Sequence, residues 1–86
     1  MKLFERLRFL EGQYMFIKWI GGNDYAKLVE SGDDYYEFNI IDIETMEYKE
    51  TVIIQHNMLI EVTFGGPDVQ RVLAEVSSQL PSVYRE

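Results

Sequence analysis

Hydrophobic and polar positions follow a two-residue repeat through the middle of the chain and a helical repeat at both ends. Between residues 13 and 64 apolar side chains recur at the spacing of strands, and segments rich in Gly, Asn and Asp interrupt them. We expect strands over residues 13–20, 25–30, 36–44, 51–55 and 58–64. The predicted order is therefore helix, five strands, helix.

The first predicted strand, QYMFIKWI, is apolar on both faces. One face carries Tyr14, Phe16 and Ile20, and the other carries Met15, Ile17 and Trp19. A strand that is apolar on both faces is covered on both faces. We expect the N-terminal helix or another subunit to supply the second cover. GGND (21–24) predicts a hairpin turn after this strand.

The alternation changes phase once, at Ile40–Ile41. Tyr36, Phe38 and Ile40 share one phase, whereas Ile41 and Ile43 occupy the other. Such a shift is typical of a β-bulge or a sharp bend, and small barrels need bends of this kind in order to close. A hairpin loop is predicted over residues 45–49. In the fifth strand, the side chains expected on one face are Met58, Ile60, Val62 and Phe64.

Both ends of the chain predict helices. Residues 2–11 place Leu3, Leu7 and Leu10 on one face, and Gly12 suits a left-handed C-terminal cap. GGPD (65–68) favours a helix start with proline in the first turn. Pro81 favours the end of that helix. The apolar face between them comprises Val69, Val72, Leu73, Val76 and Leu80.

These elements predict a mainly β protein of one domain spanning residues 1–86. The expected architecture is a small bent five-stranded antiparallel barrel with a short N-terminal helix and a C-terminal amphipathic helix. Eighty-six residues bury only a small core. Association with another subunit would therefore add useful buried surface.

Composition excludes several kinds of chemistry. The chain has no cysteine and one histidine, His56, so disulfides, thiolate metal sites and a cysteine nucleophile are ruled out. We expect no metal site and no cofactor. Charged residues interrupt MKLFERLRFL, so it does not match a signal peptide. No apolar run approaches the roughly 18 residues of a membrane span. We therefore expect a cytoplasmic protein with no membrane partner.

The negative charge is concentrated in the middle of the chain. The formal net charge is −7, and residues 24–50 carry two basic against nine acidic side chains. An acidic surface repels nucleic acid, because affinity for nucleic acid comes largely from Lys and Arg on phosphates. Charge thus argues for a protein partner, and for a basic one in particular.

Two segments resemble the strands of Sm-like small barrels. EGQYMFIKWIGGNDYAKLVE (11–30) is similar to the opening strands of that family, and TVIIQHNMLIEV (51–62) to its closing strands. The resemblance implies a leading helix, a bent five-stranded sheet, a ring-forming edge and RNA binding. The chain departs from the family at Ala26, where a glycine is usual, and at Gln55, where the host-factor branch has a basic residue. A Src-homology-type barrel has the same strand order, and the pattern does not separate the two.

The segment DDYYEFNIIDIETMEYKE (33–50) combines seven acidic side chains with four aromatic ones. It does not match the oxygen spacing of a calcium loop. One interpretation is a solvated hairpin face, and the other is a binding surface for a basic protein partner. The candidate partner-binding residues are Trp19, Asp33, Asp34, Tyr35, Glu37, Asp42, Glu44 and Tyr48.

Three classes of function remain open. The first is a non-enzymatic interaction module that self-associates and binds a protein partner. The alternative is an Sm-like RNA-binding protein whose contacts are Lys2, Arg6, Arg8, Lys18 and His56. The third is a small enzyme, which the sequence does not favour, because it contains no nucleophile motif and no phosphate loop. We therefore expect no enzyme and no catalytic residue, with a structural role for His56.

Overall fold

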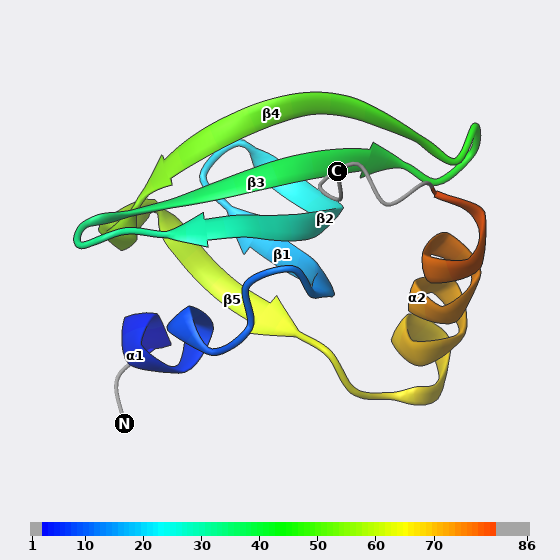
Figure 1. The fold of residues 1–86 in the computed structure, drawn as a ribbon, viewed down its shortest axis with the longest axis horizontal. Coiled ribbons are helices and arrows are strands. Elements are labelled where there is room, and N and C mark those ends of the chain that lie inside the picture. The colour runs from blue at the N-terminus through cyan, green and yellow to red at the C-terminus, as the bar shows by residue number, and fades with distance from the viewer. Residues whose placement is uncertain (1–2, 81–86) are drawn as a thin grey trace.

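Five antiparallel strands form one sheet in the order β4-β3-β2-β1-β5 (Figure 1). The computed structural model describes the backbone of residues 3–80 and the side chains of residues 6–80. The strands are β1 (Tyr14–Trp19), β2 (Gly22–Ser31), β3 (Tyr35–Asp42), β4 (Glu47–Gln55) and β5 (Leu59–Thr63). The helices are α1 (Leu3–Arg8), the short 3-10 helix η1 (His56–Met58) and α2 (Pro67–Gln79).

The mainly β class, the five antiparallel strands and the two flanking helices are confirmed. β4 and β5 occupy the two ends of the strand order, and each has one hydrogen-bonded neighbour in the described sheet. Closure into a barrel stays a prediction.

The main core lies on one face of the sheet. Met15, Ile17, Tyr36, Phe38 and Ile40 are all fully buried there, as their two-residue spacing predicted. From α1, Leu7 joins the same cluster. The predicted helix start at Lys2 lies outside the described residues.

Helix α2 covers part of the opposite face. Val76 and Leu80 pack with Ile41, and the partly buried Tyr14 and Tyr25 complete this second cluster. The helix that packs on this face of β1 is thus α2, and not α1 as we expected, whereas a cover by another subunit stays a prediction. α2 begins at Pro67, as predicted. The predicted stop, Pro81, lies outside the described residues.

The change of phase at Ile40–Ile41 reflects burial on both faces of β3. Ile40 faces the main core, whereas Ile41 faces α2, so both isoleucines are buried although the strand alternates normally. The register of β3 against β4 does shift here: Ile40 pairs with Glu50 and Ile41 pairs with Tyr48. A bulge is thus present at this point of the sheet, but its extra residue is Lys49 in β4 and not a residue of β3 as we expected.

Both predicted hairpin loops are shorter in the structure. Trp19 pairs with Gly22, so the first turn precedes most of GGND. Gly22 has a φ of 142°, a backbone conformation that favours glycine. The prediction of a loop over residues 45–49 is wrong, because β4 begins at Glu47 and includes Tyr48.

A second bulge changes the pattern of β5. Trp19 pairs with Leu59 and Lys18 with Glu61, which leaves Ile60 as the extra residue. Leu59 is consequently buried, and Ile60 is 68% exposed. The prediction that Ile60 shares the inward face of this strand is wrong.

Candidate interaction site

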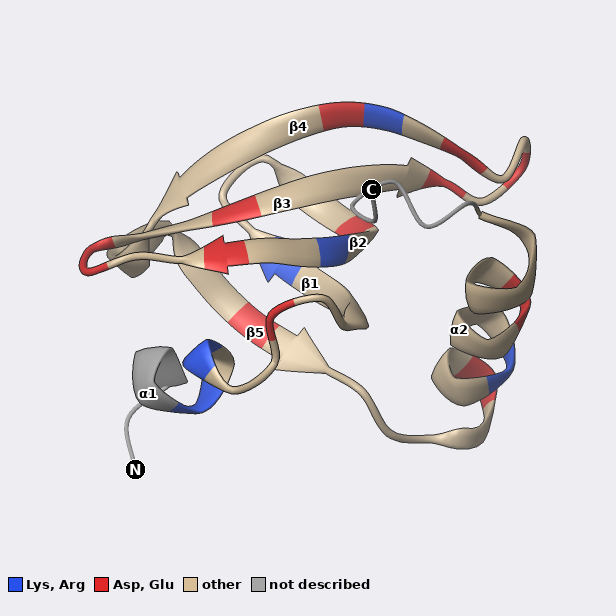
Figure 2. Cartoon of the chain, viewed as in Figure 1, with Lys and Arg blue, Asp and Glu red and all other residues tan. Residues whose placement is uncertain are grey.

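The turn between β2 and β3 meets the end of α1 at a shallow acidic notch of about 530 Å³. In Figure 2 the β2–β3 turn is red, the described part of α1 carries blue, and the loop that follows α1 carries red. The residues that line the notch are Arg8, Glu11, Glu30, Ser31, Gly32, Asp33, Asp34 and Tyr35. Four carboxylates and one guanidinium give this surface a formal charge of −3.

Backbone contacts hold the notch in shape. The Glu11 carboxylate accepts a 2.7 Å hydrogen bond from the amide of Ser31, which ties the segment after α1 to the end of β2. The amide of Gly32 donates to the carbonyl of Tyr35 at 2.9 Å and closes the turn. The Tyr35 ring occupies the space that a side chain at position 32 would need, so a larger residue there would displace the ring.

The carboxylates of the notch change the pKa of Tyr35. The nearby charge of Glu30 raises the pKa of the Tyr35 hydroxyl above its ordinary value of 10.0, because a second negative charge beside a carboxylate is unfavourable. Partial burial, a hydrogen bond with Glu30, and the charges of Glu37 and Asp33 act in the same direction. The notch therefore favours positive charge.

We expect added salt to lower the pKa of Tyr35 toward 10.0, because salt screens the carboxylates that raise it. Burial alone raises the pKa of Tyr36, so that pKa should respond much less. Both folded-state values exceed the unfolded value, so the stability that these neutral hydroxyls contribute is lost as pH rises above 10. Tyrosine absorbance during pH titration, with Tyr35→Phe to assign the group, measures this. A salt-independent pKa for Tyr35 would contradict the electrostatic cause.

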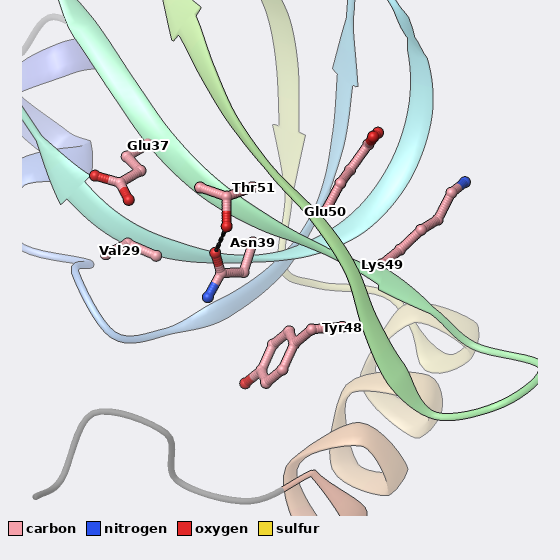
Figure 3. Close-up of a pocket in the computed structure, with 7 residues that line it drawn as sticks. All are labelled: Val29, Glu37, Asn39, Tyr48, Lys49, Glu50 and Thr51. Carbon is pink, nitrogen blue, oxygen red and sulfur yellow. Dashed lines mark hydrogen bonds between the residues drawn. The ribbon is translucent and has the colours of Figure 1, made fainter.

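A second hollow of about 500 Å³ lies over β2, β3 and β4 (Figure 3). The Thr51 hydroxyl donates to Asn39 Oδ1 at 2.7 Å across its floor. Glu37 and Tyr48 both line this hollow. Lys49 points away from the Tyr48 ring in the close-up. The hollow thus unites two of the predicted partner-binding residues, but it holds a mixture of charges.

The eight predicted partner-binding residues do not form one site. Asp33, Asp34 and Tyr35 belong to the notch. Asp42 and Glu44 belong to the other end of β3, where Asp42 Oδ1 accepts a 2.9 Å hydrogen bond from the amide of Glu44. At about 3.3 Å per residue, the eight residues of β3 separate the two turns by roughly 23 Å. The candidates of the acidic segment therefore fall on three surfaces: the notch, the hollow that holds Glu37 and Tyr48, and the β3–β4 turn.

Trp19 is engaged within the chain. Its indole nitrogen donates to Asp24 Oδ2 at 2.9 Å, and its ring covers Gly21. This arrangement stabilises the first hairpin turn, and Trp19 takes no part in the notch as described.

The predicted nucleic-acid contacts are also dispersed over the described chain. Arg6 and Arg8 lie on α1, and Arg8 faces the acidic notch. Lys18 on β1 forms a 3.5 Å ion pair with Glu61. The His56 ring makes a 2.8 Å hydrogen bond with the hydroxyl of Tyr36, and its backbone amide donates to the carbonyl of Asp34. The bridging contacts of His56 agree with the structural role that we expected, and Lys2 lies outside the described residues.

Four residues of the notch were absent from the candidate lists: Glu11, Glu30, Ser31 and Gly32. Ser31 and Glu11 are twenty residues apart in the sequence, and only the fold joins them. No local pattern marks Glu11 as part of the notch, since it lies between α1 and β1 in the sequence. Glu30 directly precedes the turn that contains Asp33 and Asp34.

Comparison with models of known protein families, with curated proteins and with solved structures finds no significant match. Within residues 3–80, no helix is long and apolar enough to cross a lipid bilayer. In the same part of the chain, no group of three or more His, Asp or Glu side chains is placed to hold a metal ion.

Proposed function

We propose that this protein is a non-enzymatic interaction module that self-associates through the edges of its sheet and binds a protein partner. One observation carries the proposal. β4 and β5 are the terminal strands of the sheet, and each presents an edge without a strand neighbour in the described structure. Unpaired edges bind further strands, because their N–H and C=O groups are available for a new ladder.

Both edges carry an exposed apolar side chain. Ile53 on β4 is 67% exposed and Ile60 on β5 is 68% exposed. Charged residues protect many edge strands, and β4 carries Glu47, Lys49 and Glu50 in its first half. Its second half, residues 51–55, carries no charge. A second copy of the chain would pair with the edge and remove these isoleucines from water, which stabilises the complex.

Pairing of β4 in one copy with β5 in the next is head-to-tail. Such an interface forms a ring when the rotation between copies closes, and a filament when it does not. We also propose that the strongly curved sheet is that of a small barrel, with β4 and β5 at its seam. The two register shifts beside these strands support the bend that a barrel requires.

The acidic notch is the second part of the proposal, since it provides a surface for a partner of opposite charge. It lies at the β2–β3 turn, and β4 and β5 remain free for self-association. A partner that carries basic residues would be attracted by charge and would associate faster at low salt.

Light scattering over a concentration series tests self-association. We expect a mass above the 10.2 kDa of one chain, and a lower mass for the double variant Ile53→Lys with Ile60→Lys. The control is Phe9→Lys, which replaces a 78% exposed apolar residue away from both edges. A monomeric wild type at high concentration would refute self-association. If Phe9→Lys lowered the mass as much as the double variant does, the edges would not be the interface.

A further inference from the structure

Helix α2 covers only one end of its face of the sheet in the described structure (Figure 1). Val76 and Leu80 pack on Ile41 near the end of β3. Asn39 and Glu37 lie on the same face of this strand, because strand side chains alternate. Both line the hollow of about 500 Å³ over β2, β3 and β4 (Figure 3). The hollow therefore begins where the cover by α2 stops.

The hollow combines apolar surface with a buried cation beside it. Val29 and Tyr48 line it, and both are half-buried. Lys27 pairs with Asn39 in the sheet, so its side chain lies on the same face, and its Nζ lies 5.4 Å from the centre of the Tyr14 ring. Lys27 is only 7% exposed, and an ammonium is rarely buried this far without an anionic or polar neighbour. A segment with an aromatic side chain and a carboxylate would therefore suit this surface.

The chain leaves α2 beside this hollow. Leu80 and Tyr48 belong to the same cluster, and Tyr48 also lines the hollow. Leu80 has an extended backbone, with a φ of −81° and a ψ of 139°, as expected for the residue before a proline. The sequence continues with PSVYRE (81–86). Six extended residues reach about 20 Å, whereas Glu37 lies about 13 Å from Ile41 along β3. The segment is thus long enough to cross the hollow.

We propose that residues 81–86, which follow the described residues, form a strap that binds in the hollow and completes the cover of this sheet face. The Tyr84 ring packs on Val29 and Tyr48, which removes apolar surface from water. Tyr48, a candidate for partner binding, then contacts its own chain. This inference requires neither self-association nor a partner, so it is independent of the proposed function.

A carboxylate gives the strap its second contact. Glu86 and Tyr84 are two residues apart, so an extended segment directs both side chains to the same side. The Lys27 ammonium donates a hydrogen bond to the Glu86 carboxylate. Because Lys27 is little exposed, water and salt screen this ion pair less than a pair on the open surface. Arg85 lies between the two contacts and points to the other side.

A double-mutant cycle in the full chain tests the strap, with the equilibrium constant for unfolding measured by urea denaturation. We expect Glu86→Gln to raise this constant by about threefold or more when Lys27 is present. In the Lys27→Met background the same substitution should leave the constant nearly unchanged, because the ion pair is already lost. Additive effects of the two substitutions would overturn the strap.

A matched control removes the same charge elsewhere. Asp68→Asn neutralises an exposed carboxylate at the start of α2. We expect this substitution to have the same effect with and without Lys27→Met, because residues that share no contact act additively. If Asp68→Asn coupled to Lys27→Met as strongly as Glu86→Gln does, the coupling would follow net charge, and the strap would be overturned.

A second measurement needs no substitution, so it does not depend on how well the variants fold. In the unaltered protein we expect nuclear Overhauser effects between the Tyr84 ring and the methyl protons of Val29, since these effects require the protons to be close together. Their absence would overturn the strap. A mixture of isotope-labelled and unlabelled chains shows which copy supplies the segment. Effects seen only between copies would overturn a strap formed within one chain.

Discussion

Replacement of Phe38 with alanine is expected to lower the free energy of unfolding by about 3–5 kcal/mol. Phe38 is fully buried and lies in the main core beside Tyr36, with the two ring centroids 6.4 Å apart. A small domain is stabilised by only about 5–15 kcal/mol in total. The variant should therefore be partly unfolded or close to unfolding at room temperature, which urea denaturation followed by circular dichroism measures.

Phe9→Ala is the matched control for this substitution. Phe9 is 78% exposed, so the same chemical change removes little buried surface there. We expect a change of no more than about 0.5 kcal/mol. If the two alanine variants were equally stable, the placement of Phe38 in the core would be wrong.

Replacement of Val76 with aspartate is expected to detach α2 from the sheet. Val76 is fully buried against Ile41 and Leu80, and an ionised carboxylate in that position would lose its hydration. The loss in stability of the docked helix is at least the 1.5–3 kcal/mol or so that burial of a valine side chain contributes. Hydrogen exchange should become faster in α2 while β2 and β3 remain protected, because the described α2 side chains belong to the second cluster and not to the main core.

Ala74→Asp serves as the control on the same helix. Ala74 is exposed, so aspartate there changes the helix propensity without placing a charge in the cluster. We expect α2 to remain docked in this variant. If the strands of Val76→Asp lost protection together with α2, the helix would not be a separable layer, and the two clusters would form one cooperative core.

Much of the fold follows from local patterns. The two-residue spacing of Tyr36, Phe38 and Ile40 predicted the inward face of β3, because side chains in a strand alternate whatever the strand packs against. Pro67 marked the start of α2, because its backbone preference is a property of the single residue. The predicted helix end at Gly12 is wrong, because α1 ends at Arg8. These predictions required no knowledge of distant contacts.

The candidate site was predicted only in part. Asp33, Asp34 and Tyr35 were identified because they are neighbours in the sequence and share a turn. Trp19, Asp42 and Glu44 were grouped with them by composition, and the structure places these residues at other turns of the sheet. Because these acidic residues are close in the sequence, we predicted a single surface. In the structure, β3 separates the two turns that carry them.

The sequence by itself determined the class of the protein, its element order and the negative charge of its middle, since these depend on residue types and local spacing. Tertiary structure decided which faces are buried. Ile41 is buried only because α2 docks on it, and Ile60 is exposed only because a bulge turns it outward. Tertiary structure also built the notch, where the chain brings Glu11 to the amide of Ser31 from twenty residues away. Docking, bulges and long-range contacts depend on how elements pack against each other, and no local pattern contains that information.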